Sequence, residues 1–170
     1  MRALGALLML LAAMPVHADW RADVQAAHLV GEGDFSVFGF TLYRAQLWSE
    51  HAAVNYDAPF ALHLIYTRSI SRERFADIGI NEIKRQAATP IPQETLERWR
   101  DDMVRGLTDV EPGGQLSAVF LPGKGVRFYA GERETAEIDD PAFARAFFDI
   151  WLAASTRAPK LRIQLLGSPQ

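Results

Sequence analysis

The chain has 170 residues, a formal net charge of −3 at pH 7 and no cysteine. A chain of this length suits one domain with a substantial core, and packing must stabilise that core because no disulfide can form. The basic residues are scattered rather than clustered, which argues against nucleic acids and anionic membranes as partners.

The first eighteen residues are typical of a secretory signal peptide. A basic start at Arg2 is followed by the apolar run Ala3–Met14 and by small residues up to Ala18. A run of about twelve apolar residues is too short to span a bilayer, which needs roughly twenty. We therefore predict cleavage after Ala18, export to a bacterial periplasm and a single domain over residues 19–170. The alternative is a buried N-terminal helix.

Residues 28–48 combine aromatic and β-branched side chains with three glycines, which favours two extended strands. The pair Gly33-Asp34 is a turn signal, so we expect the strands to be joined there, with Gly39 marking a bulge. The next predicted strand, Phe60–Arg68, is mostly apolar on both of its alternating faces. Such a strand is expected to be covered on both sides of the sheet.

Helical spacing follows in two segments separated by the helix-breaking sequence ATPIPQ. Ser69 or Ser71 provides an N-cap for a helix that runs through Gln86. A second helix is predicted over residues 92–107, where an apolar stripe lies opposite charged residues. The stripe consists of Leu96, Trp99, Met103 and Leu107.

Three short strands linked by tight turns come next, and two helices complete the predicted elements. Asp140 is suited to be an N-cap and Pro141 suits the first position of a helix. The elements are strands Gln115–Leu121, Val126–Ala130 and Thr135–Ile138, a helix after Asp140, and a helix at Lys160–Leu166 that ends at Gly167. This order indicates an α+β domain with helices layered on one face of an antiparallel sheet.

Four stretches of the chain, in this order, carry a family resemblance: GFTLYRAQLW, YTRSI, FLPGKGVRFYAGERETAEIDDPAF and WLAASTRAPKLRIQLLG. Together they resemble the bacterial exported branch of the chalcone isomerase-like family. The resemblance implies an open-faced β-sandwich with an apolar ligand cleft between the sheet and its helices. The family has a plant branch that closes a flavanone ring from a chalcone, and a non-catalytic branch that binds fatty acids.

The resemblance also allows the catalytic residues of the plant branch to be sought in this chain. That branch uses an arginine of the first strand, a threonine and a tyrosine that orient a water, and an asparagine and a second threonine at the distal hydroxyl. Here GEGDFSV contains no arginine, and Phe38 takes the place of the first threonine when Tyr43 is aligned with the family's tyrosine segment. Arg74 replaces the catalytic tyrosine, Asn81 matches the asparagine, and Thr135 is an open match for the second threonine. Without a cation and a hydroxyl to stabilise the developing charge, we expect no chalcone cyclisation.

Two groups of polar residues are candidates for reading a carboxylate. Arg44 lies within an apolar strand, so it either forms an ion pair with Glu50, Asp57 or a helix carboxylate, anchors an anionic ligand, or is exposed on an edge. Tyr66 and Arg68 are two positions apart on one strand and project to the same face. A hydroxyl and a guanidinium there could grip a carboxylate, or they could simply cap a strand end in solvent.

We therefore predict a non-catalytic protein that binds a small amphipathic carboxylate such as a fatty acid, without a cofactor. Burying ten methylenes would contribute roughly 8 kcal/mol before costs. The predicted ligand-binding residues are Tyr43, Arg44, Tyr66, Arg68, Arg74 and Asn81. The histidines lack metal-ligand spacing, so no metal site is predicted, and the sequence identifies no protein partner. The alternatives are an isomerase or lyase with a site around Arg44, Arg74 and Asn81, and an interaction module whose cleft is filled by its own side chains.

Overall fold

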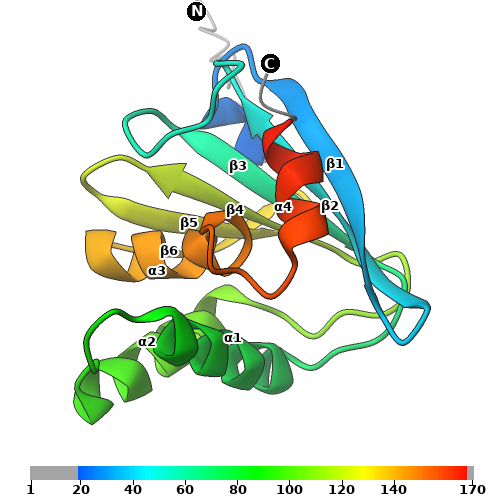
Figure 1. The fold of residues 1–170 in the computed structure, drawn as a ribbon. Coiled ribbons are helices and arrows are strands. Elements are labelled where there is room, and N and C mark those ends of the chain that lie inside the picture. The colour runs from blue at the N-terminus through cyan, green and yellow to red at the C-terminus, as the bar shows by residue number, and fades with distance from the viewer. Residues whose placement is uncertain (1–18, 168–170) are drawn as a thin grey trace, which may run out of the picture.

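A six-stranded antiparallel sheet organises the residues that the computed structural model describes, 19–167. Each strand pairs with the next one along the chain, so the order across the sheet is β1-β2-β3-β4-β5-β6 (Figure 1). The strands are β1 (His28–Val37), β2 (Phe40–Ser49), β3 (Phe60–Tyr66), β4 (Gln115–Leu121), β5 (Gly125–Ala130) and β6 (Arg133–Ile138). The predicted signal peptide lies outside the described residues.

Four helices cover one face of this sheet, which we call the helix face (Figure 1). Ser71 caps the first helix and Asp140 caps the third by accepting a hydrogen bond from the backbone N–H three residues on. The helices are α1 (Arg72–Gln86), α2 (Gln93–Gly106), α3 (Pro141–Leu152) and α4 (Pro159–Leu166). The predicted fold class, an α+β open-faced β-sandwich, is therefore confirmed, and the predicted helix and strand boundaries from residue 60 onward differ by at most two residues.

The turn between β1 and β2 is not at Gly33-Asp34 as predicted. β1 continues to Val37, and the turn is formed by Phe38 and Gly39, both with positive φ, so that Gly39 is a turn residue rather than a bulge. Gly33 and the neighbouring Gly31 serve a different purpose, because α4 packs directly against this part of β1. A Cβ atom added at Gly31 would lie 2.1 Å from a backbone carbonyl oxygen of α4. Mid-strand glycine here marks close approach of another segment.

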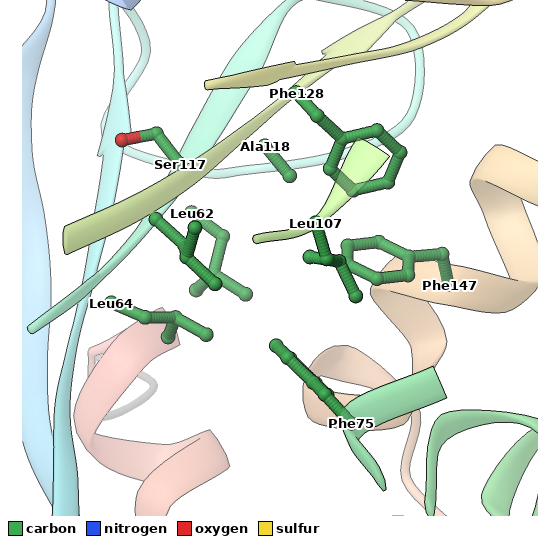
Figure 2. Close-up of a pocket in the computed structure, with 9 residues that line it drawn as sticks. Leu62, Leu64, Phe75, Leu107, Ser117, Ala118, Phe128 and Phe147 are labelled. Atoms are coloured by element: carbon green, nitrogen blue, oxygen red, sulfur yellow. The ribbon is translucent and has the colours of Figure 1, made fainter. Parts of the chain in front are cut away.

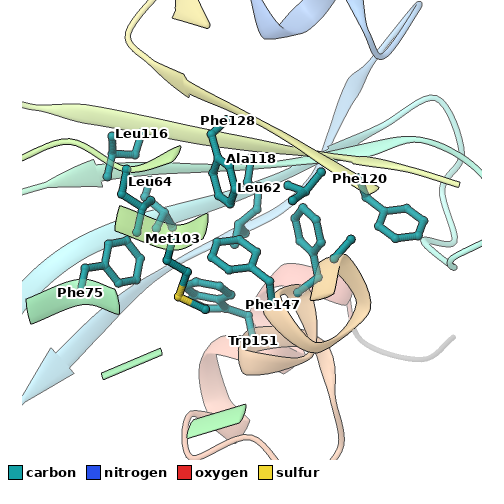
Figure 3. Packing of buried hydrophobic residues seen from close by; sticks show 14 of the residues in the cluster. Leu62, Leu64, Phe75, Met103, Leu116, Ala118, Phe120, Phe128, Phe147 and Trp151 are labelled. Atoms are coloured by element: carbon teal, nitrogen blue, oxygen red, sulfur yellow. The ribbon is translucent and has the colours of Figure 1, made fainter. Parts of the chain in front are cut away.

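The other face of the sheet, which we call the far face, is also partly covered, by the residues that precede β1. Leu62 and Leu64 of β3 pack into the cluster under the helices, where Figure 3 shows Met103, Phe147 and Trp151 reaching towards the strands. Ala61 of β3 points the other way and packs with residues of a short 3-10 helix, η1 (Trp20–Ala22), and of the strands beside it. The predicted cover on both faces of β3 is thus confirmed.

Candidate functional site

Two tyrosines meet on the helix face near the hairpin end of the sheet. Tyr43 of β2 and Tyr66 of β3 are direct neighbours in the antiparallel register, and their ring centroids are 5.5 Å apart. Side chains at paired positions of adjacent strands project to the same face, which is why the two phenols lie side by side. Of the residues predicted to bind a ligand, these are the two that the structure brings together.

The hydroxyl groups of this tyrosine pair retain hydrogen-bonding capacity. Trp151 of α3 donates its indole N–H to the Tyr43 hydroxyl oxygen at 2.9 Å. Among the described residues, neither the Tyr43 O–H nor the Tyr66 hydroxyl donates to an acceptor, although Tyr66 is only 4% exposed. Within residues 19–167, every fully buried side-chain nitrogen or oxygen has a hydrogen-bond partner. Because the Tyr66 hydroxyl has none, it is not fully buried and keeps some contact with solvent. The pair therefore offers two free donors at the rim of the core.

Burial raises the pKa of both phenols. For Tyr43, burial outweighs the opposing effect of the hydrogen bond from Trp151. For Tyr66, burial is again the main cause, and the neighbouring Tyr43 raises the pKa further. Both groups are consequently neutral hydrogen-bond donors over the whole physiological pH range.

Other aromatic rings pack against the tyrosine pair. Phe35 of β1 stacks on Tyr43 with ring centroids 5.1 Å apart, and Phe75 of α1 meets Tyr66 edge-on at 6.2 Å. Trp151 in turn contacts Phe75 edge-on at 6.4 Å. A polar head group placed between the tyrosines would thus be enclosed by apolar surface.

A small cavity lies behind Phe75, between the helices and the centre of the sheet (Figure 2). Its volume is about 10 Å³, which is room for roughly one water molecule. The other lining residues are Leu62, Leu64, Leu107, Leu116, Ser117, Ala118, Phe128 and Phe147. The hydroxyl of Ser117 points away from the cavity and bonds His63 on the far face, so the walls are apolar. The cleft implied by the family resemblance is nearly closed in this structure.

Arg44 forms an ion pair, but with a carboxylate that the sequence did not suggest. Its guanidinium donates two hydrogen bonds to Asp34, at 2.8 and 3.2 Å, and both side chains are about half exposed. Asp34 and Arg44 are paired across β1 and β2 on the far face. The predicted partners Glu50 and Asp57 do not take part. Asp34 was not predicted as the partner, because the sequence placed it in a turn, whereas it lies within β1.

The remaining predicted residues lie apart from the tyrosine pair. Arg68 is exposed beyond the end of β3, with its guanidinium 5.1 Å from the centre of the Phe40 ring. Arg74 and Asn81 are exposed on α1, and the sheet separates them from Arg44. Among the described residues, no guanidinium therefore reaches the tyrosine hydroxyls, and the alternative enzyme site is not assembled.

The two positions aligned with catalytic threonines also have other surroundings. Phe38 lies in the hairpin turn and is 95% exposed. Thr135 of β6 donates its hydroxyl hydrogen bond to the backbone carbonyl of Gly106, which ties the strand to the end of α2. Neither contributes a group that could polarise a ketone beside Tyr43.

Trp151 contacts the tyrosine pair but was not among the residues predicted to bind a ligand. The contact between Trp151 and Tyr43 joins residues 108 positions apart, so no local spacing signals it. Phe75 was likewise absent from the predicted ligand-binding residues. Its position between the tyrosine pair and the cavity follows from the packing of α1 against the sheet.

Residues 19–167 lack two other features that would indicate a function. That part of the chain contains no group of three or more His, Asp or Glu side chains placed to hold a metal ion. It also contains no helix long and apolar enough to cross a membrane.

Comparisons with known proteins place this fold in a family. The family model described as chalcone isomerase-like matches residues 16–167. The chain belongs to the chalcone isomerase-like family. A protein of Haemophilus influenzae described as uncharacterized is 27% identical over 139 residues, which cover 81% of this chain and 67% of that protein.

A solved structure of a fatty-acid binding protein from Arabidopsis thaliana has the same fold. It superimposes with a TM-score of 0.62 over 82% of this chain and 86% of that chain. The sequence identity is 12%, so this likeness concerns the arrangement of strands and helices.

Proposed function

We propose that the protein binds a fatty acid or a similar small apolar acid, with the head group at Tyr43 and Tyr66 and the hydrocarbon chain beneath Phe75. The observation that carries this proposal is the hydroxyl of Tyr66, which is nearly buried and has no partner among the described residues. A nearly buried donor without an acceptor is unfavourable unless a ligand or a water completes it. Membership of the family and the shared fold of the Arabidopsis thaliana protein support the same choice of ligand.

The site chemistry favours an uncharged head group. Because no guanidinium from residues 19–167 lies at the tyrosines, a desolvated carboxylate would lack a compensating charge there, and a protonated acid or another neutral acceptor is bound more easily. Two neutral hydrogen bonds contribute about 1 kcal/mol each, whereas each buried methylene contributes about 0.8 kcal/mol. Affinity therefore comes mainly from the chain, and the tyrosines fix its orientation.

Binding requires the interior to widen, since the cavity of about 10 Å³ is far smaller than a ligand pocket of several hundred Å³. Phe75 lines the cavity and Met103 belongs to the core cluster around it, so movement of these two side chains would widen the interior. Met103 is fully buried, and its sulfur approaches to 3.0 Å from where Gly79 of α1 would carry a Cβ. An unbranched thioether beside a glycine can change rotamer at little cost, so α1 and α2 form the adaptable wall.

The test is calorimetric titration with saturated fatty acids of increasing chain length. Tyr66→Phe should weaken binding about five- to ten-fold, because one hydrogen bond of about 1 kcal/mol is lost. Tyr129→Phe is the matched control, since its hydroxyl donates to Asp23 on the far face. A fatty alcohol should bind within about ten-fold of the acid of equal length. Equal affinity of the wild type and Tyr66→Phe, or strict dependence on an ionised carboxylate, would contradict the proposed site.

We also propose that residues 1–18 direct export to the periplasm and are removed after Ala18. The support is the basic start, short apolar run and small residues of this segment. The mass of protein recovered from the periplasmic fraction of an expressing bacterium tests it. Protein that stays in the cytoplasm with its full mass would refute export.

One observation favours a second candidate function, an interaction module with a filled interior. The cavity on the helix face holds only about 10 Å³. This candidate predicts that the titration shows no saturable uptake at any chain length. It also predicts that Leu64→Ala, which enlarges the cavity, lowers the stability of the fold but does not increase the uptake of fatty acid above that of the wild type.

A further inference from the structure

The β1–β2 turn displays an apolar tip, which we define as residues 37–40. Phe38 is 95% exposed, Phe40 is 60% exposed and Val37 is 38% exposed. In Figure 1 this turn extends beyond the helices as the far end of the hairpin. Beside it, Val37, Phe40, Leu42 and Arg68 line an open groove of about 330 Å³. Adjacent exposed apolar residues at a protruding turn are unusual on a protein surface and mark an interaction site.

The tip is held in a strained conformation. Phe38 has φ +50° and Gly39 has φ +82°, as in the type I′ turns that close two-residue hairpins. Asparagine and glycine are preferred at the first of these positions, and a bulky aromatic residue is disfavoured there. The turn is nonetheless fixed at its base, where the Ser36 and Thr41 hydroxyls are 3.1 Å apart and Thr67 donates its hydroxyl hydrogen bond to the Thr41 carbonyl at 2.6 Å. Strain that is retained to expose an aromatic ring points to a function for that ring.

We propose that this apolar tip inserts into the surface of a phospholipid bilayer with electrically neutral head groups. The tip is too small for a stable protein interface, which takes roughly twenty residues from each partner. A convex turn carrying two phenylalanines can instead enter the boundary between head groups and acyl chains. The guanidinium of Arg68 beside Phe40 lies where a lipid phosphate would be met. The net charge of −3 and the scattered basic residues argue against an anionic surface.

The inference does not depend on the proposed ligand, although the two sites are close. Tyr43 is three positions from Phe40 along β2, a distance of roughly 10 Å. A protein docked through the tip would hold its tyrosine pair near the bilayer surface. Vesicle binding can nevertheless be measured without any fatty acid, so failure of either proposal is recognised separately.

The test is co-sedimentation of the purified protein with phosphatidylcholine vesicles. Phe38→Asn relieves the turn and removes the ring, so we expect it to raise the urea midpoint while lowering the vesicle partition coefficient at least five-fold. Ile78→Gln is the matched control, because Ile78 is 51% exposed on α1, away from the tip, and it should bind vesicles as the wild type does. All proteins are purified in the same form, so a difference in partition between them reports the substituted side chain.

Three results would overturn the proposal. The wild type could stay in the supernatant when the vesicles sediment, or the Phe38→Asn variant could sediment with them as well as the wild type does. The third result is self-association of the wild type in analytical ultracentrifugation that Phe38→Asn abolishes, which would assign the tip to contact between two copies of the chain. Adding 0.5 M salt should change partition less than two-fold if the lipid surface is neutral.

Discussion

His63 should make the stability of the fold depend on pH between about pH 4 and pH 6.5. It lies on the far face of β3, is 6% exposed, and its Nδ1 is 2.8 Å from the Ser117 hydroxyl oxygen. The Trp20 ring stacks over it with centroids 5.9 Å apart. Burial, together with the positive charge of the nearby Arg21, lowers the pKa of His63 to about 4, although Asp19 opposes the shift.

The size of the effect follows from the difference between the two states. An unfolded histidine titrates near pH 6.5, so between about pH 6.5 and pH 4 the unfolded chain binds a proton that the folded chain does not. Stability is therefore complete above pH 6.5 and falls as the pH decreases. The loss is about 1.4 kcal/mol at pH 5.5 and approaches roughly 3 kcal/mol near pH 4.

The assay is urea unfolding followed by tryptophan fluorescence at pH 7.5 and 5.5, for the wild type and for His63→Gln. Glutamine can keep a hydrogen bond to Ser117 but does not titrate. The wild type should lose about 1.4 kcal/mol more than the variant between the two pH values. The comparison concerns the change with pH, so a lower absolute stability of the variant does not affect it. Identical pH dependence in both proteins would refute the reasoning.

Three substitutions test the packing and the ion pairs by the shift in urea midpoint. Gly106→Ala places a Cβ atom 2.3 Å from the buried Phe128 ring and should destabilise the fold by about 1 to 3 kcal/mol; an unchanged midpoint would mean that the ring can move. Asp140→Ala removes hydrogen bonds to the N-terminus of α3 and to an indole of α2, with an expected loss of about 1 to 3 kcal/mol. Arg44→Ala should leave the midpoint unchanged within error, because its ion pair with Asp34 is solvent-exposed, and a large loss would show that this pair contributes more than exposed pairs do.

Local signals predicted most of the fold. Gln115–Leu121 was predicted to the residue, because the turns EPGG and PGKG bound it on both sides. The predicted position of the turn between β1 and β2 was wrong. Gly33 allows close packing of α4, which follows about 130 residues later in the sequence. Nothing near Gly33 in the sequence distinguishes a glycine needed for close packing from one needed for a turn. The partner of Arg44 was missed for the same reason.

The candidate site was only partly predictable. That Tyr43 and Tyr66 lie on the helix face follows from strand alternation, which determines the face on which each lies, whereas their role in binding a ligand stays a prediction. Two things were beyond the sequence: the indole of Trp151 on Tyr43, and the near closure of the interior. Both depend on how side chains from distant helices fill the space above the sheet, and periodicity does not determine that.

The strand order has a consequence for how copies of the chain behave when concentrated. Because each strand pairs only with its sequence neighbours, β1 and β6 each have one side without a pairing strand from residues 19–167. Glu32 and Asp34 lie on one of these margins, and Glu134 and Glu137 lie on the other. A second molecule that extended the sheet from either side would have to place its strand beside these charged side chains, and charged edge strands disfavour growth into fibrils.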